Sequence, residues 1–277
     1  MSTDHLIREE NNGQETQSSV SIREASAFII NRAREVVNNL AVSRGHQNPP
    51  FLAKDLAACM GIKDVVSANL GELDGTLLRH IDGYMIKVNV NHNEVRQNFS
   101  CAHEIGHILL DELDKKFDAS IVELRGGTTI TGNEKERLCN IAAAELLMPV
   151  PVFSKYLSDL GLSIDSIESL ARIFKVSIQA AAIKVQEIGP KSCRIIFWKR
   201  CHRNRSHGFI QTHSKRPACE TYVRDPSSLL KAYESNCTIK AYKCFKIDNS
   251  SRRCLMESKG FGRDKIRYVL SLVFLEQ

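Results

Sequence analysis

The stretch Phe99-Ser-Cys-Ala-His-Glu-Ile-Gly-His-Ile-Leu-Leu110 decides how this chain folds and what it can hold. In an α-helix, side chains four positions apart lie on one face, so the imidazoles of His103 and His107 can reach a single metal ion. Glu104, beside the first histidine, is placed to act as a general base on water. Apolar residues can bury the same helix in a core: Ala102, Ile105, Ile108 and Leu109. The stretch therefore predicts an active-site helix.

A third metal ligand is expected about thirty residues downstream. A catalytic zinc keeps three protein ligands and one open position. The run from Glu136 to Pro149 reads as a helix that the proline stops, and Glu136 and Asn140 lie on one side of it. We expect Glu136 to complete the metal site and Asn140 to orient a ligand histidine, with the two helices antiparallel. The alternative is that Glu136 is an ordinary solvated charge and the histidines an exposed pair.

Both motifs resemble those of the ImmA/IrrE-type metallopeptidases. That family has a HEIGH-like helix and, some thirty residues later, a helix of the form Glu-x-x-Ala-Asn/Asp-x-Phe-Ala that ends in Leu-Leu-Met-Pro. This chain has Glu136-Arg-Leu-Cys-Asn-Ile-Ala-Ala and then Leu146-Leu-Met-Pro149. It departs from the pattern at Cys139 and Ala142, which we interpret as packing positions. The resemblance covers residues 50–150 well.

The resemblance implies a fold, a cofactor and a substrate. The fold would be α+β, with a zincin-like metallopeptidase core, and the cofactor one Zn²⁺ ion. Mn²⁺ or Fe²⁺ also suit two histidines and a carboxylate, so ligand type leaves the native metal open. The implied substrate is a cytoplasmic helix-turn-helix repressor, whose cleavage would derepress genes. The residues alone indicate metal-assisted hydrolysis of a peptide bond. For the group that stabilises the oxyanion, the candidates are Tyr84, Tyr156 and the C-terminal histidines.

The composition indicates a water-soluble protein of the cytoplasm. The 277 residues are 43% hydrophobic and 25% charged, and no apolar run approaches the length of a membrane helix. Residues 1–20 are polar and lack the apolar core of a signal peptide, so we expect a disordered extension. Nine cysteines without an export signal favour free thiols in a reducing compartment.

The first half of the chain alternates between helical and strand-like patterns. Apolar residues at helical spacing predict a helix over residues 21–43, and residues 51–61 read as a short second helix. Residues 62–91 shift to alternating, β-branched patterns with turn signals, which predicts two or three strands. We expect this region to supply an edge strand for an extended peptide substrate, with a purely structural hairpin as the alternative. The metallopeptidase domain would then span residues 21–150.

Residues 151–189 have the pattern of a helix-turn-helix unit, with Ser177 capping its second helix. Such a unit resembles DNA readers, but the second helix offers few contacts to bases or phosphates: Gln179, Lys184 and Gln186. A recognition helix normally carries more positive charge. We therefore favour a structural or partner-docking role over DNA binding.

Residues 190–277 form a basic region with short alternating runs, which predicts a small mixed or β-rich domain. This region holds 19 Lys and Arg against 7 Asp and Glu, whereas the preceding residues are net acidic. The basic region could attract nucleic acid or an acidic protein, serve as a sensor or substrate-docking module, or be a solvated surface.

Three functions fit these observations. The first is the zinc endopeptidase described above. The second is a non-catalytic regulator that binds DNA or a partner and keeps a structural or degenerate metal site. The third is the enzyme of a toxin–antitoxin-like pair, which would use the same chemistry on another target.

Overall fold

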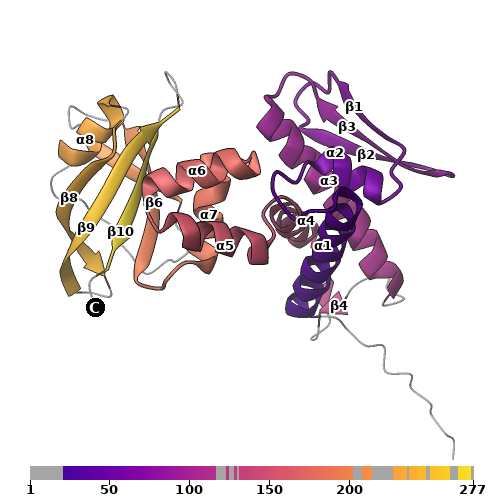
Figure 1. The fold of residues 1–277 in the computed structure, drawn as a ribbon, viewed down its shortest axis with the longest axis horizontal. Coiled ribbons are helices and arrows are strands. Elements are labelled where there is room, and N and C mark those ends of the chain that lie inside the picture. The colour runs from indigo at the N-terminus through magenta and orange to yellow at the C-terminus, as the bar shows by residue number, and fades with distance from the viewer. Residues whose placement is uncertain are drawn as a thin grey trace, which may run out of the picture.

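The structure is a computed structural model of the 277-residue chain. It describes residues 21–116, 123–124, 128–129, 131–201, 208–213, 227–235, 237–247, 250–262 and 268–275. The predicted extension at residues 1–20 lies outside these ranges, as do His202 and His207. The elements form a helical and sheet-bearing N-terminal part, a bundle of short helices, and a C-terminal sheet (Figure 1).

Helix α1 (Ile22–Arg44) begins and ends at strong local signals. Ser21 and Glu24 form a reciprocal capping box at its start, and Gly45 ends it at φ 72°. Its buried stripe packs against α4 and α3. The short helix α2 (Ala53–Cys59) follows and packs on α1 and α3. Both predicted helices are confirmed.

A three-stranded sheet lies over the active-site helix. The strands β1 (Asp64–Ala68), β2 (Gly75–His80) and β3 (Gly83–Asn89) have the order β1-β3-β2. β1 is parallel to the central β3, and β2 is its antiparallel hairpin partner. Ile86 and Val88 of β3 are buried, whereas Val90 follows the strand and is exposed. Within the described strands, β2 is the edge beside the active-site helix α3 (Glu94–Lys116).

Helices α3 and α4 (Gly132–Leu147) run antiparallel and form the most extensive helix pair of the fold. α4 begins at a capping box of Thr131 and Glu134 and stops before Pro149, as predicted. The pair can approach so closely because residue 106 is glycine. A Cβ there would lie 2.9 Å from the Cα of Cys139 and 3.0 Å from its carbonyl oxygen. In the sequence between the two helices, the strands β4 (Glu123–Leu124) and β5 (Thr128–Thr129) form a two-stranded antiparallel ladder.

Gly106→Ala is expected to lower the free energy of unfolding by about 1–3 kcal/mol. The added methyl group meets α4 backbone, which cannot swing aside as a flexible side chain would. Gly132→Ala is the matched control, because a Cβ there meets nothing within 4 Å. Urea unfolding of the two variants measures the difference. Equal urea midpoints for the two variants would show that α3 and α4 can move apart at residue 106 without a loss of stability.

Three short helices follow α4: α5 (Val150–Leu160), α6 (Ile164–Phe174) and α7 (Ile178–Ile188). Ser177 caps α7 through the backbone N–H of Ala180 at 3.0 Å, which confirms the helix-turn-helix pattern. Lys175 makes the tight turn between α6 and α7 in a left-handed conformation, with φ 51°.

The predicted nucleic-acid contacts of α7 are largely turned inward. Lys184 is 4% exposed, and its Nζ lies 2.8 Å from Oε2 of Glu145 in α4. Arg34 of α1 donates to Oε1 of the same carboxylate at 2.7 Å. Gln186 accepts from the backbone N–H of Ile195 at 2.6 Å. Two of the three side chains that the sequence offers as possible contacts to DNA, Lys184 and Gln186, therefore serve contacts within the protein.

The C-terminal region is a five-stranded antiparallel sheet with one helix, so the β-rich prediction is confirmed. Its strands have the order β7-β6-β10-β9-β8. They span β6 (Cys193–Cys201), β7 (Gly208–His213), β8 (Ile239–Ile247), β9 (Ser250–Phe261) and β10 (Tyr268–Phe274). Helix α8 (Ser227–Glu234) covers one face over a small core that contains Trp198 and Met256.

The other face of this sheet joins the main core and packs on α6 and α7. Polar contacts also join the sheet to α6. Glu257 of β9 accepts from the first backbone N–H of α6, at Ile164, and Lys259 lies 2.7 Å from Glu168. The architecture as a whole is α+β, as expected. No single helix in the described ranges meets the length and apolarity of a membrane span, although the bent pair α4–α5 does so jointly by length and composition.

Candidate metal centre

The two histidines of α3 and the glutamate of α4 meet at one point between the helices. Nε2 of His103 lies 3.1 Å from one carboxylate oxygen of Glu136, and Nε2 of His107 lies 3.7 Å from the other. The imidazole rings stand edge to face with centroids 5.1 Å apart. The one-turn spacing on each helix thus brings three predicted ligands together.

This donor set fits a tetrahedral metal ion. With metal–ligand bonds of about 2.1 Å, neighbouring ligand atoms of a tetrahedral zinc lie about 3.4 Å apart. The two nitrogen–oxygen distances fall on either side of that value. Burial lowers the pKa of His107, and the neighbouring His103 adds to this shift, so its ring favours the neutral form that binds metal.

The opposite ring nitrogen of each histidine is held by α4. Nδ1 of His103 lies 3.2 Å from Oδ1 of Asn140, and Nδ1 of His107 lies 3.3 Å from Sγ of Cys139. Hydrogen bonds of this kind fix the ring orientation and leave Nε2 for a ligand. Asn140 therefore lies where the sequence predicts it. The contact of Cys139 with His107 was not predicted, because an apolar-looking helix position gives no sign of which ring it touches.

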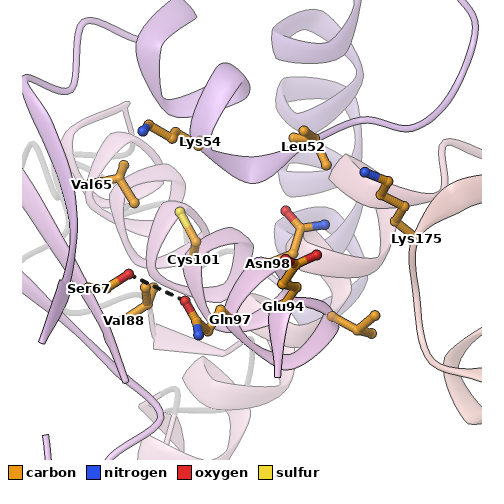
Figure 2. Close-up of a pocket in the computed structure, with 11 residues that line it drawn as sticks. Leu52, Lys54, Val65, Ser67, Val88, Glu94, Gln97, Asn98, Cys101 and Lys175 are labelled. Carbon is orange, nitrogen blue, oxygen red and sulfur yellow. Dashed lines mark hydrogen bonds between the residues drawn. The ribbon is translucent and has the colours of Figure 1, made fainter. Parts of the chain in front are cut away.

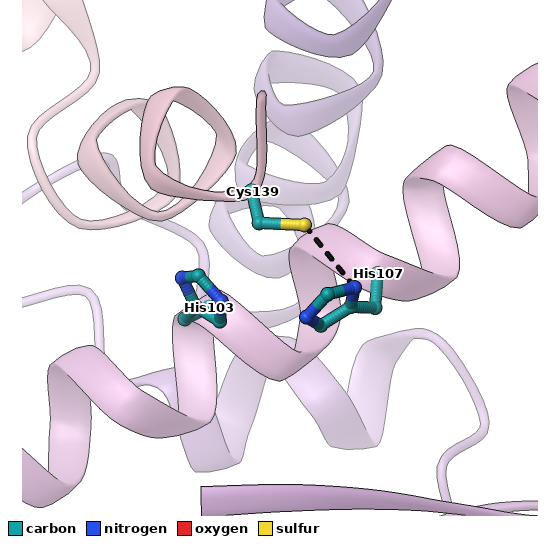
Figure 3. Close-up of side chains that lie close together, drawn as sticks. All are labelled: His103, His107 and Cys139. Carbon is teal, nitrogen blue, oxygen red and sulfur yellow. Dashed lines mark hydrogen bonds between the residues drawn. The ribbon is translucent and has the colours of Figure 1, made fainter. Parts of the chain in front are cut away.

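His103, His107 and Cys139 also form a compact group of potential ligands (Figure 3). We favour Glu136 over Cys139 as the third ligand. The thiol faces Nδ1 of His107, whereas the Glu136 carboxylate lies between the two Nε2 atoms. Burial, together with the negative charges of Glu136, Glu104 and Asp111, raises the pKa of the Cys139 thiol to about 12.

Glu136→Ala should abolish stoichiometric zinc binding, whereas Cys139→Ala should retain it with an affinity at most about tenfold weaker. The first variant removes one of three ligands, and the second removes only a weak hydrogen bond to the far side of one ring. Zinc content by elemental analysis and competition with a chromophoric chelator measure both effects. Reversed affinities would assign Cys139 as the ligand.

Glu104 lies under the edge strand β2, close to the histidines. The residue is 8% exposed, and a Cβ on Gly75 would come within 3.1 Å of Oε1 of Glu104. Burial raises the pKa of Glu104, and the charge of Glu136 acts in the same direction, while His103, the backbone N–H of Leu77 and Arg79 lower it. A carboxyl group with a raised pKa is suited to proton transfer near neutral pH. In the sequence, Gly75 reads only as part of a turn, so the close approach of Glu104 to this glycine of β2 could not be predicted.

The candidates for an oxyanion donor lie at different distances from the candidate metal centre. Tyr84 of β3 donates to Asp111 at 3.4 Å, and Asp111 lies one helical turn beyond His107. Arg79 of β2 donates hydrogen bonds to the same carboxylate from Nε and Nη2, at distances of 3.0 Å or less. Tyr156 instead packs edge-on against Phe174 in the helical bundle. The side chains of the C-terminal histidines lie outside the described residues. Of the candidates that can be placed, only Tyr84 lies beside the metal helix.

Comparison with known proteins agrees with this geometry. The peptidase M78 family model, described as an IrrE N-terminal-like domain, matches residues 57–186. The radiation response metalloprotease IrrE of Deinococcus radiodurans is 36% identical over 107 residues, which make up 38% of this chain and 32% of that protein. The match thus spans about a third of the relative's length.

A solved structure of a Mycobacterium tuberculosis transcriptional regulator is similar to nearly the whole chain. Its TM-score is 0.53 at 15% identity, covering 92% of this chain and 82% of that one, which supports the fold alone. The residues that the family model matches include both helices of the candidate metal centre, α3 and α4. Residues 57–186 of this chain are therefore similar to the IrrE N-terminal-like domain of the M78 peptidases, the same ImmA/IrrE-type family that the two sequence motifs resemble.

Proposed function

We propose that the chain is a zinc-dependent endopeptidase that hydrolyses a peptide bond in a cytoplasmic protein. The observation that carries this proposal is the convergence of three ligand atoms from His103, His107 and Glu136 next to a buried carboxylate, Glu104. When bound, zinc supplies a Lewis acid and brings the pKa of water near neutrality. Similarity to this family supports a metallopeptidase, and the donor set supports zinc.

The protein groups have separate roles in this proposal. Glu104 accepts the proton of the attacking water and later passes it to the leaving amine. Asn140 and Cys139 hold the histidine rings so that the ligand nitrogens stay fixed. Tyr84 is the proposed donor to the oxyanion, from its place beside Asp111. The exposed edge of β2 would hold the substrate as an added strand, because main-chain hydrogen bonds accept any sequence.

The proposed substrate is a helix-turn-helix transcriptional repressor, whose cleavage would derepress its genes. The family resemblance supports this choice, and the name of the IrrE relative, a radiation response metalloprotease, links such a domain to a stress response. A non-catalytic role in DNA binding has less support, since Lys184 and Gln186 of α7 are engaged within the protein.

Incubation with purified helix-turn-helix repressors from the same genome tests the proposal. Zinc-loaded wild type is expected to cut one of them at a defined bond, and Glu104→Gln to bind the same zinc without cutting. Mass spectrometry of the fragments identifies the bond. If wild type leaves all of them intact but binds DNA in a salt-sensitive way, the protein is a regulator and the protease proposal fails.

A further inference from the structure

A cavity of about 440 Å³ lies beside α3, on the face turned away from the metal ligands. Its wall on α3 is formed by Glu94, Gln97, Asn98 and Cys101, which follow one another at helical spacing. Cys101 is two positions from His103, and residues two apart on a helix point to different sides. This space, the α2–α3 cavity, is therefore separate from the metal centre and has the size of a small-molecule site.

The floor of the α2–α3 cavity is apolar. Leu52, Val65, Val88 and Val95 line it, together with the buried thiol of Cys101. A buried thiol packs as a small hydrophobic group. Such a floor suits the hydrocarbon part of a ligand and excludes a fully hydrated ion.

The rim carries charge of both signs with a positive excess. Lys54 of α2 and Lys175 of the α6–α7 turn stand on opposite sides in the view of Figure 2, and Glu94 is the acidic group that lines the space. A monoanion matches this balance, whereas the carboxylate of Glu94 disfavours a polyanion such as a phosphate ester.

One residue of the cavity wall, Asn98, has a buried hydrogen-bond donor without an acceptor in the described part of the chain. Oδ1 of Asn98 accepts from the backbone N–H of Ala53 at 2.8 Å, which fixes the orientation of the amide. Its Nδ2 is buried and has no partner among the residues that the structure describes. Figure 2 shows this nitrogen turned to the side of Lys175. A buried donor without an acceptor is costly, so an acceptor at this end would be favourable.

We propose that the α2–α3 cavity binds a small amphipathic monocarboxylate. Its carboxylate lies at the end with Lys175 and Asn98, and its apolar body covers Val65 and Val88. The ligand would touch α2, the sheet, α3 and the α6–α7 turn at once. It would thereby brace the helix that carries His103 and His107 from the opposite side, independently of what the metal centre does.

Isothermal titration of the full, zinc-loaded chain with 4-phenylbutyrate tests this site. We expect saturable binding in about the millimolar range or tighter, and at least about tenfold weaker binding of 4-phenylbutan-1-ol, which lacks the charge. Lys175→Met should weaken binding of the acid about tenfold, while Lys155→Met, an exposed lysine of α5, should leave it unchanged.

Methyl NMR of the wild-type chain locates the ligand without a variant. Shifts concentrated at Val65, Val88 and Val95 would support the proposal. The proposal is overturned if the acid does not bind, if acid and alcohol bind equally, or if the shifted methyl groups lie elsewhere. Each of these results is independent of peptidase activity.

Discussion

Glu104→Gln is expected to lower kcat/KM for the cleaved protein by about 10²–10⁴-fold, with zinc content equal to wild type. The amide keeps the size of the side chain under β2 but cannot take up a proton. Because Glu104 is not one of the three proposed ligands, the substitution leaves His103, His107 and Glu136 in place. Single-turnover assays with the purified repressor measure the loss.

Glu234→Gln is the matched control for this experiment. Glu234 is exposed on α8 in the C-terminal region, so its substitution should change neither zinc content nor rate. Undiminished cleavage by Glu104→Gln would show that another group accepts the proton. Loss of zinc from that variant would instead show that Glu104 helps to hold the metal.

Lys184→Met is expected to lower the free energy of unfolding by about 3 kcal/mol at pH 7, although it touches no part of the metal centre. Lys184 and Glu145 are 4% and 2% exposed, so the substitution leaves a buried carboxylate with Arg34 as its remaining charged partner. Lys155→Met, on the surface of α5, should stay within about 0.5 kcal/mol of wild type.

The loss of unfolding free energy in Lys184→Met should become smaller as the pH falls. Burial alone would raise the pKa of Glu145, but Lys184, Arg34 and the N–H of Val150 outweigh it, and the net pKa is lowered. This ion pair therefore stabilises the fold fully above the unfolded pKa, about 4.3, and loses its effect as the pH falls through the lower folded value. Urea unfolding at pH 7 and pH 4 should show a smaller difference between wild type and Lys184→Met in acid. A constant difference would mean that packing, not charge, is lost.

The placement of the candidate ligand side chains could be predicted closely because its signals are local. The spacing of His103 and His107, and of Glu136 and Asn140, follows from the geometry of a single helix. Two antiparallel helices are then the simplest arrangement that brings the two motifs together. The caps at Ser177 and Pro149 likewise depend only on neighbouring residues.

The features that could not be predicted all depend on contacts between distant segments. Gly106 and Gly75 look like ordinary glycines until another backbone or a carboxylate lies against them. Lys184 reads as a solvated cation, and its partner Glu145 is 39 residues away on a different helix. The parallel pairing of β1 with β3 has no signature in either strand, because pattern alone does not choose a neighbour.

The carboxylate of Glu145 sets a limit on how the chain can be divided. A fragment that stops at residue 150, the predicted end of the catalytic domain, retains every proposed metal ligand and still contains Glu145 and Arg34. It lacks the ammonium group of Lys184, so the buried carboxylate of Glu145, on the helix that carries Glu136, keeps only Arg34 of its two cationic partners. The segment that contains the proposed metal ligands thus ends at α4, whereas the segment needed to pair Glu145 with both of its cations extends into α7.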